Sequence, residues 1–175
     1  MHSIALVGMD GSIDWCCLPR FDSPSVFGAI LDDRKGGFFK IAATNPDVFC
    51  RQMYLPETNV LVTRFLSPEG VGEIVDFMPL THGPAQSPGR HQIVRIVTGV
   101  RGAVKFRTEC RPAFDYARAG HELVISASGA SFRASGMRLD LACPCGLRAE
   151  DGAAVTEFTL HANESRTFLL TLAAD

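Results

Sequence analysis

The sequence has no long apolar run and no segment typical of a secretory signal. Its apolar stretches are short and interrupted by Gly, Ser or charged residues, whereas a membrane-spanning helix needs ~20 apolar residues. Residues 1–3 lack the positively charged region of a signal peptide, although residues 4–7 are apolar. These absences predict a cytoplasmic protein, or an internal fragment of one, with no membrane partner.

An excess of charge of one sign is also missing. The 17 basic and 19 acidic residues give a formal net charge of −2, whereas a nucleic-acid-binding domain carries clustered Lys and Arg. We therefore expect no nucleic-acid partner. The same balance provides no attraction to an anionic membrane surface.

Common catalytic and cofactor motifs are absent. The sequence contains no Gly-x-Ser-x-Gly, P-loop, Gly-x-Gly-x-x-Gly or His-Glu-x-x-His pattern. The segment 10–14 resembles the start of a calcium loop, but Trp15 occupies the position where an EF-hand needs Gly. Glu73 and Asp76 are three residues apart, so in a strand they lie on opposite faces and cannot form a glycosidase acid–base pair. We expect no catalytic residue, no metal site and no cofactor in this chain.

The six cysteines lack the spacing of a zinc knuckle or a thioredoxin motif. Cys143-Pro144-Cys145 is one residue short of Cys-x-x-Cys, and the adjacent Cys16 and Cys17 point to opposite faces of a strand. We expect reduced, buried cysteines that act as small apolar residues. Disulfides or a bound metal are the alternatives.

Short alternating runs of β-branched and aromatic residues fill the sequence, with Gly, Pro, Ser or Asn about every ten residues. This pattern predicts an all-β protein, and so many short strands favour a large antiparallel sandwich of two packed sheets. The predicted strands cover residues 4–7, 12–18, 38–42, 48–54, 59–66, 71–78, 92–100, 103–111, 121–126, 131–135, 137–143, 154–160 and 166–173.

The clearest local prediction is a hairpin at Ser67-Pro68-Glu69-Gly70, because Pro and Gly occupy their preferred positions in a type I turn. Its predicted register is Leu66–Val71, Arg64–Glu73, Thr63–Ile74, Val62–Val75, Leu61–Asp76 and Val60–Phe77. If the face that carries Asp76 is buried, this carboxylate needs a partner.

One helix is predicted near residues 24–32. Ser23 would cap it, Pro24 would occupy its first position, and Phe27, Ile30 and Leu31 recur at helical spacing. The segment 79–91 is rich in turn residues and has no periodicity, so we expect an exposed, mobile loop there.

The segment 10–24 has the densest concentration of polar and conformationally restricted residues. It contains the only Trp of the chain, Trp15, together with Arg20 and Asp22 near a Pro-bounded turn. An indole face can stack on a sugar ring, and Arg and Asp can bind sugar hydroxyls. These three residues are therefore candidates for the rim of a substrate site. The alternative is structural, with Trp15 in the core and Arg20 and Asp22 holding the turn.

Three motifs in this order resemble glycoside hydrolase family 15, in particular its bacterial glucoamylase- and trehalase-like enzymes. Gly8-x-Asp10-Gly-Ser-Ile-Asp-Trp15 followed by Leu18-Pro-Arg-Phe-Asp-Ser-Pro24 is similar to the opening of these enzymes. Tyr54-Leu-Pro-Glu-Thr-Asn-Val-Leu61 and Asp76-Phe-Met-Pro79 are further matches. The resemblance covers essentially the whole chain.

The resemblance implies that residues 1–175 are a single N-terminal β-sandwich domain of the supersandwich type. In the family this domain packs on a C-terminal (α/α)₆ barrel, which carries two catalytic Glu residues and hydrolyses α-glucosidic bonds with inversion. The barrel is expected to be absent here, and an N-terminal strand is expected to be missing, because relatives usually start earlier. The implied partners are the barrel and an α-glucoside, such as trehalose or a malto-oligosaccharide, at the domain boundary.

Two other functions are compatible with the sequence. A stand-alone carbohydrate-binding sandwich would need exposed aromatic platforms, but one Trp and two Tyr stand against twelve Phe, which usually fill cores. A structural or oligomerisation module would present an exposed apolar patch. Without its barrel the chain would expose such a patch, so self-association is also expected.

Overall fold

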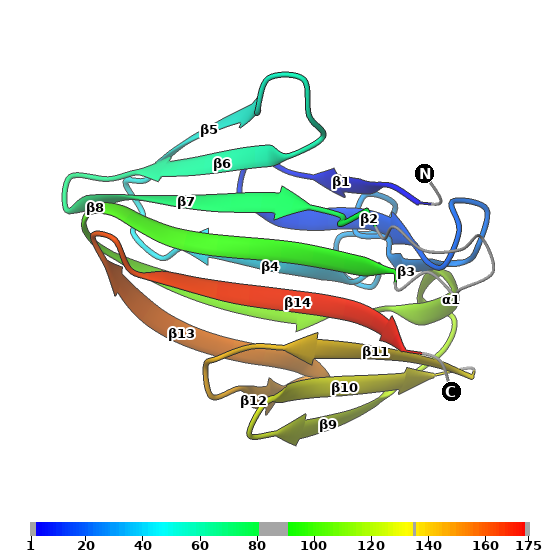
Figure 1. Cartoon of the computed structure of the whole chain (residues 1–175). Coiled ribbons are helices and arrows are strands. Elements are labelled where there is room, and N and C mark those ends of the chain that lie inside the picture. The colour runs from blue at the N-terminus through cyan, green and yellow to red at the C-terminus, as the bar shows by residue number, and fades with distance from the viewer. Residues whose placement is uncertain (1–2, 81–90, 135, 174–175) are drawn as a thin grey trace.

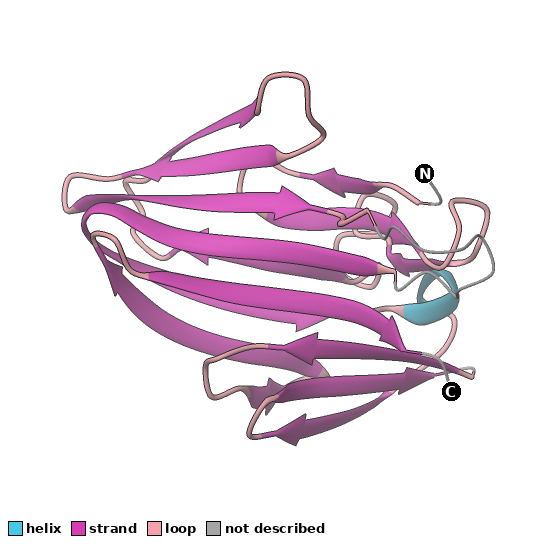
Figure 2. Cartoon of the chain, in the orientation of Figure 1, coloured by secondary structure: helices cyan, strands magenta, loops and turns pink. Residues whose placement is uncertain are grey.

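The computed structural model describes residues 3–80, 91–134 and 136–173, and these are dominated by strands (Figure 2). The all-β prediction is confirmed. Ten residues of the loop predicted at 79–91, namely 81–90, lie outside the described residues. The elements of the described residues are β1 (Ala5–Val7), β2 (Ser12–Cys17), β3 (Ser25–Phe27), β4 (Phe38–Ala43), β5 (Phe49–Tyr54), β6 (Leu61–Leu66), β7 (Gly70–Phe77), β8 (Gln92–Arg111), α1 (Phe114–Ala117), β9 (Glu122–Ser126), β10 (Gly129–Ala134), β11 (Met137–Ala142), β12 (Arg148–Glu150), β13 (Ala153–His161) and β14 (Ser165–Ala173).

The strands form two antiparallel layers that are joined into one hydrogen-bonded sheet (Figure 1). One layer has the order β5-β6-β7-β8-β14-β11-β10-β9. The other layer contains β1, β2, β3, β4, β8, β13 and β12, with β3 and β4 both paired to β2. The predicted two-sheet sandwich is therefore confirmed, with the addition that its two sheets are continuous.

Strand β8 makes this continuity possible. Its first half pairs with β7 and β14 in one layer, and its second half pairs with β4 and β13 in the other. The sequence predicted two strands here, interrupted near Gly102. In the structure Gly102 adopts a positive φ of 64° and lies opposite Gly70, so the chain changes layer without ending the strand. A side chain at residue 102 would clash, because its Cβ would lie 2.1 Å from the Glu69 carbonyl oxygen.

The helix predicted near residues 24–32 is wrong. Residues Ser25–Phe27 form β3, which pairs with β2 and buries Val26 and Phe27 in the core. The residues at apparent helical spacing do not form one buried face, because Ile30 and Leu31 are exposed whereas Phe27 is buried. Pairing with β2 and burial between the layers outweigh the local Ser-Pro signal. The structure also contains a second strand that the sequence analysis missed, β12.

The only helix of the described residues is α1, a single turn. Asp115, Tyr116 and Ala117 have positive φ values of 52°, 56° and 63°, so the turn is left-handed. Such a backbone costs about 1–2 kcal/mol per residue. It is anchored because Phe114 is buried and the Ala113 N–H donates to the Val26 carbonyl of β3.

The predicted hairpin register between β6 and β7 is confirmed for the predicted pairs from Leu66–Val71 to Leu61–Asp76. The predicted Val60–Phe77 pair is not part of this ladder, because β6 begins at Leu61. The face that carries Thr63, Ile74 and Asp76 is buried. Arg64 and Glu73 form an ion pair on the other face. Because the face that carries Asp76 is buried, its carboxylate requires a partner inside the sandwich.

That partner is Arg95 of β8, which is fully buried. Its Nε and Nη2 donate to the two carboxylate oxygens of Asp76 at 2.8 and 3.1 Å. Its Nη1 donates to the Phe39 carbonyl at 2.5 Å, and Nη2 also donates to the Gly11 carbonyl at 2.7 Å. Four of the five guanidinium N–H groups are thus satisfied, and the guanidinium lies 4.8 Å from the centre of the Phe39 ring. Because Asp76 and Arg95 belong to one layer and Phe39 to the other, this network connects the two sheets.

Phenylalanine rings fill the rest of the interlayer space. Phe65 contacts Phe106 edge-on at 5.8 Å between ring centres, Phe106 stacks on Phe158, and Phe158 contacts Phe168. This run of rings begins in one layer, passes through the other and returns, so it joins the layers by apolar contact. The prediction that most Phe residues fill the core is confirmed by seven buried rings: Phe27, Phe39, Phe65, Phe106, Phe114, Phe132 and Phe168.

Replacing Asp76 by Ala should destabilise the fold by about 3–5 kcal/mol, because Arg95 would remain buried without its counter-charge. Urea unfolding followed by circular dichroism measures this change. The matched control is Glu73→Ala, which removes the partly exposed ion pair of the same strand and should cost under about 1 kcal/mol. Equal losses in the two variants would contradict the assigned role of Arg95.

Candidate functional site

The candidate residues lie along β2 and the loop that returns the chain to β3. Gly11 precedes β2 with a φ of 77°, and its carbonyl accepts hydrogen bonds from Ile41 N–H and from Arg95. A Cβ at this position would lie 2.2 Å from the Ile41 carbonyl oxygen, so Gly is required. The buried network therefore fixes the start of the segment that carries Trp15, Arg20 and Asp22.

Asp10 is held beside this start by Lys40. The Lys40 ammonium lies 2.5 Å from an oxygen of Asp10. Burial raises the pKa of the Asp10 carboxyl, but the hydrogen bond and charge of Lys40, together with backbone hydrogen bonds, lower it more, so its pKa lies below the ordinary value. Asp10 is thus an ionised partner of Lys40 at neutral pH.

Arg20 and Asp22 form a bidentate ion pair within one exposed turn. Arg20 Nε and Nη2 donate to the two oxygens of Asp22 at 3.0 and 3.2 Å. The Ser23 N–H donates to the Arg20 carbonyl at 3.0 Å, and the Arg20 N–H donates to the Ser23 hydroxyl at 3.2 Å. The side chains of Arg20 and Asp22 are 66% and 55% exposed. These contacts hold the turn, as the structural alternative expects, and they also leave both charged groups accessible to a ligand.

Trp15 is half-buried, not sealed in the core as the structural alternative expects. Its ring centre lies 6.4 Å from that of Tyr116 in α1, with the planes tilted by 37°. The Tyr116 hydroxyl lies 3.5 Å from the Ser23 carbonyl. Tyr116 therefore connects Trp15 to the turn that contains Arg20 and Asp22.

The left-handed turn α1 brings two side chains to the site that the sequence did not nominate, Tyr116 and Arg118. Arg118 lies over the Tyr116 ring at 5.6 Å and forms a 2.6 Å ion pair with Asp115. The sequence offered little indication of this turn, because left-handed backbone usually requires Gly, and less often Asn or Asp, and residues 114–117 contain only Asp115 of these. We call Trp15, Arg20, Asp22, Tyr116 and Arg118 the loop cluster.

Exposed apolar side chains flank the loop cluster. Phe21 is 70% exposed between Arg20 and Asp22, and Ile30 and Leu31 project from the loop that follows β3. Strand β14 ends at Ala173 at the same end of the sandwich as α1 (Figure 1). This end therefore combines exposed apolar groups, accessible charges and the last strand of the fold.

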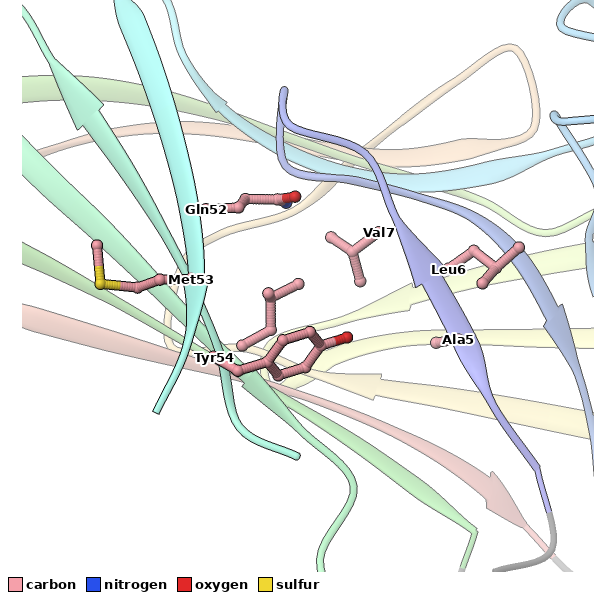
Figure 3. A pocket seen from close by; sticks show the side chains of 7 residues that line it. Ala5, Leu6, Val7, Gln52, Met53 and Tyr54 are labelled. Atoms are coloured by element: carbon pink, nitrogen blue, oxygen red, sulfur yellow. The ribbon is translucent and has the colours of Figure 1, made fainter. Parts of the chain in front are cut away.

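A groove of about 270 Å³ lies elsewhere, between β1 and the β5–β6 hairpin. Gln52 and Tyr54 point from β5 toward Ala5 and Val7 of β1, whereas Met53 points away (Figure 3). The Gln52 amide donates to the Gly8 carbonyl and to Thr63, so its donors are already used. The residues that line this groove include no carboxylate, His or Lys for acid–base chemistry.

The described residues offer no metal-binding cluster of three or more His, Cys, Asp or Glu side chains. Over the same residues, no helix has both the length and the apolar character required to cross a membrane. Four of the six cysteines, Cys16, Cys17, Cys110 and Cys143, are buried as predicted, whereas Cys50 and Cys145 are half-buried.

Replacing Tyr116 by Ala should increase the solvent exposure of Trp15 and shift its fluorescence to longer wavelength. Since Trp15 is the only Trp, the emission spectrum of the folded chain reports this change directly. Tyr54→Ala, at an exposed tyrosine in the groove, is the control and should leave the emission unchanged. An unshifted spectrum for Tyr116→Ala would show that Tyr116 does not cover Trp15.

Comparison with known families and proteins gives consistent matches. The family described as "Trehalase-like, N-terminal" matches residues 1–171. A trehalase of Thermoplasma acidophilum is 41% identical over 115 residues, which is 64% of this chain and 19% of that protein. A trehalase of Mycobacterium tuberculosis is 35% identical over 132 residues, which is 68% of this chain and 19% of that protein. Trehalase 1 of Sulfolobus acidocaldarius is 41% identical over 107 residues, which is 61% of this chain and 17% of that protein. The chain thus matches less than a fifth of the length of these relatives, and the relatives include archaeal as well as bacterial proteins.

Proposed function

Because the chain belongs to the family of trehalase-like N-terminal domains, we propose that it is the non-catalytic sandwich of a longer glycoside hydrolase of family 15. The longer protein would hydrolyse an α-glucosidic bond, and the trehalases that the chain resembles make trehalose the first substrate to test. The family match over residues 1–171 is the observation that carries this proposal.

The arrangement of carboxylates supports a non-catalytic role. An inverting glycosidase needs two carboxyl groups that face a shared cleft at ~6.5–9.5 Å. In the structure, Asp76 is neutralised by Arg95 in the core, and Glu150 and Glu157 are paired with basic residues on an outer face. The groove between β1 and β5 includes no carboxylate in its lining. The chemistry is therefore assigned to the C-terminal barrel of the longer protein.

The end that carries the loop cluster is the proposed contact with this barrel. Exposed Phe21, Ile30 and Leu31 would be covered there, which explains large apolar side chains on a sandwich with a filled core. A polypeptide that continues beyond β14 would also leave the sandwich at this end (Figure 1). Trp15, Arg20 and Asp22 would then lie at the rim of the barrel's substrate site.

The division of labour is tested by measuring glucose release from trehalose and from maltose. The 175-residue chain and the longer protein are assayed side by side. We expect activity in the longer protein only. The ratio of its rate on trehalose to its rate on maltose identifies the preferred sugar. Glucose release by the 175-residue chain itself would overturn the assignment.

The rim role is tested in the longer protein with Arg20→Ala and Asp22→Asn. We expect kcat/KM to fall roughly tenfold, or about 1.4 kcal/mol of transition-state stabilisation. Because the ion pair is exposed, the free energy of unfolding should change by less than about 1 kcal/mol. Arg138→Ala is the matched control, since it breaks another partly exposed Arg–Asp pair two residues apart, in β11. Unchanged kinetics in the two loop variants would rule out the rim role while leaving the division of labour intact.

Binding of sugar by the isolated chain is the competing function, and half-buried Trp15 beside Tyr116 is the observation that favours it. Titration with trehalose or maltoheptaose while recording Trp15 fluorescence separates the two functions. Our proposal predicts no saturable change in the isolated chain, because its rim is complete only with the barrel in place.

A further inference from the structure

A second cleft, of about 680 Å³, lies between the loop that follows β11 and the start of β14. The end of β11 and the start of β14 lie at the end of the sandwich away from α1 (Figure 1). Cys143 and Cys145 of the loop line this cleft together with Arg166 of β14. The proposed trehalase-like function does not involve these three residues.

Cys143 and Cys145 are held close together by contacts between the Cys143 thiol and the Cys145 backbone. The Cys145 N–H donates to the Cys143 sulfur at 3.2 Å, and the Cys143 thiol lies 3.3 Å from the Cys145 carbonyl oxygen. Pro144 between them has a fixed φ, so the chain has little freedom to separate the two sulfurs.

Arg166 places an unneutralised positive charge beside this pair. Among the described residues it forms no ion pair with a carboxylate, and its Nε is buried without a hydrogen-bond partner. Burial raises the pKa of both thiols, that of Cys143 to about 12, while the charge of Arg166 lowers both. Both thiols are therefore protonated at neutral pH, and the charge of Arg166 favours the small thiolate fraction, which is the nucleophile in disulfide exchange.

The other cysteines do not form a pair of neighbouring thiols in a cleft. Cys16 and Cys110 are fully buried, and Cys17 is nearly so. Cys50 is half-buried but belongs to no described pair of neighbouring thiols. Only at Cys143 and Cys145, within the described residues, do two neighbouring thiols line a cleft beside an unpaired cation.

From this juxtaposition we propose that Cys143 and Cys145 are a reversible redox pair whose substrates are low-molecular-weight disulfides. The half-buried Cys145 loses its proton to solvent and attacks one sulfur of the small disulfide, which forms a mixed disulfide and releases one thiolate. Cys143 then loses its proton and attacks the Cys145 sulfur, which forms the Cys143–Cys145 bond and releases the second thiolate. Protonation of the two released thiolates completes the balance: two protein thiols are oxidised and one small disulfide is reduced to two thiols.

Closing this bond should change the chemical state of the loop without stabilising the fold. The stabilisation that a disulfide provides grows with the length of the loop it closes, and this loop contains a single intervening residue. A structural disulfide would raise the melting temperature, whereas this pair should leave it almost unchanged.

The test uses the folded 175-residue chain equilibrated with oxidised glutathione, quenched with acid and alkylated. Trypsin releases residues 139–148 as one peptide that contains both cysteines, because Arg138 and Arg148 flank them. We expect this peptide to become lighter by two hydrogen atoms and to resist alkylation, and reduction with dithiothreitol should reverse both changes. Cys16, Cys17 and Cys110 should remain alkylatable after denaturation, which shows that the reaction occurred in the folded chain.

Variants separate the two steps. Cys143→Ser should accumulate glutathione on Cys145, because the second thiol is missing, whereas Cys145→Ser should leave buried Cys143 unmodified. Arg166→Gln should slow formation of the mixed disulfide roughly threefold by removing the charge beside the thiols. Arg133→Gln, which removes an exposed Arg of β10, is the control and should react at the original rate.

Two results would overturn the proposal. One is a 139–148 peptide that remains fully alkylatable after equilibration of the folded chain with the disulfide. The other is equal oxidation of Cys16 and Cys17, which would mean that the bonds form only in unfolded molecules. Neither result bears on glucose release by the longer protein, so this proposal and the proposed function can fail independently.

Discussion

The buried guanidinium of Arg95 is the contact on which the arrangement of this sandwich depends. It is bound by the Asp76 carboxylate within its own layer, and it donates to the Phe39 and Gly11 carbonyls of the other layer. An ion in an apolar interior is unfavourable unless its hydrogen bonds are satisfied. The two layers can therefore pack only in the relative position that satisfies the hydrogen bonds of the Arg95 guanidinium. The phenylalanine rings supply most of the apolar contact, but they would allow small shifts of one layer against the other. Arg95 and Asp76 fix the layers at one relative position.

This constraint extends to the surface through Gly11. The same carbonyl that accepts from Arg95 belongs to the tight turn that starts β2, and β2 carries Trp15 to the end of the sandwich. Strand β3 then returns beside β2 and anchors α1 through the Ala113 N–H. Tyr116 can therefore reach both Trp15 and the Ser23 carbonyl. The position of the exposed loop cluster is thus set by a hydrogen-bond network in the core, and the left-handed backbone of α1 is tolerated because both of its sides are anchored.

The two ends of the sandwich differ in chemistry. The end with α1 presents exposed apolar side chains and a preformed Arg20–Asp22 pair, which suits contact with a further domain and with a polar ligand at its edge. The opposite end presents two neighbouring thiols beside an uncompensated Arg166. The two ends are separated by the length of the strands, so a change in the redox state of the thiols leaves the loop cluster free to serve a neighbouring domain.

The sequence by itself determined the β class, most strand positions and the register of the hairpin between β6 and β7, because alternation and turn chemistry act over a few residues. It also showed that Asp76 would need a partner, and its motifs from Asp10 to Pro24 indicated the family. It did not identify Arg95 as that partner, because Arg95 lies opposite Asp76 only once β8 pairs with β7. It also did not identify Tyr116 as a neighbour of Trp15, because these residues are 101 positions apart in the chain and meet only in the folded sandwich. The segment from Ser25 to Phe27 carries a local helix signal that pairing with β2 overrides. The continuity of β8 through Gly102 was likewise decided by tertiary structure. In an isolated hairpin a positive φ at this residue would end the strand. Here the strand continues from one sheet into the other, because both layers provide pairing partners.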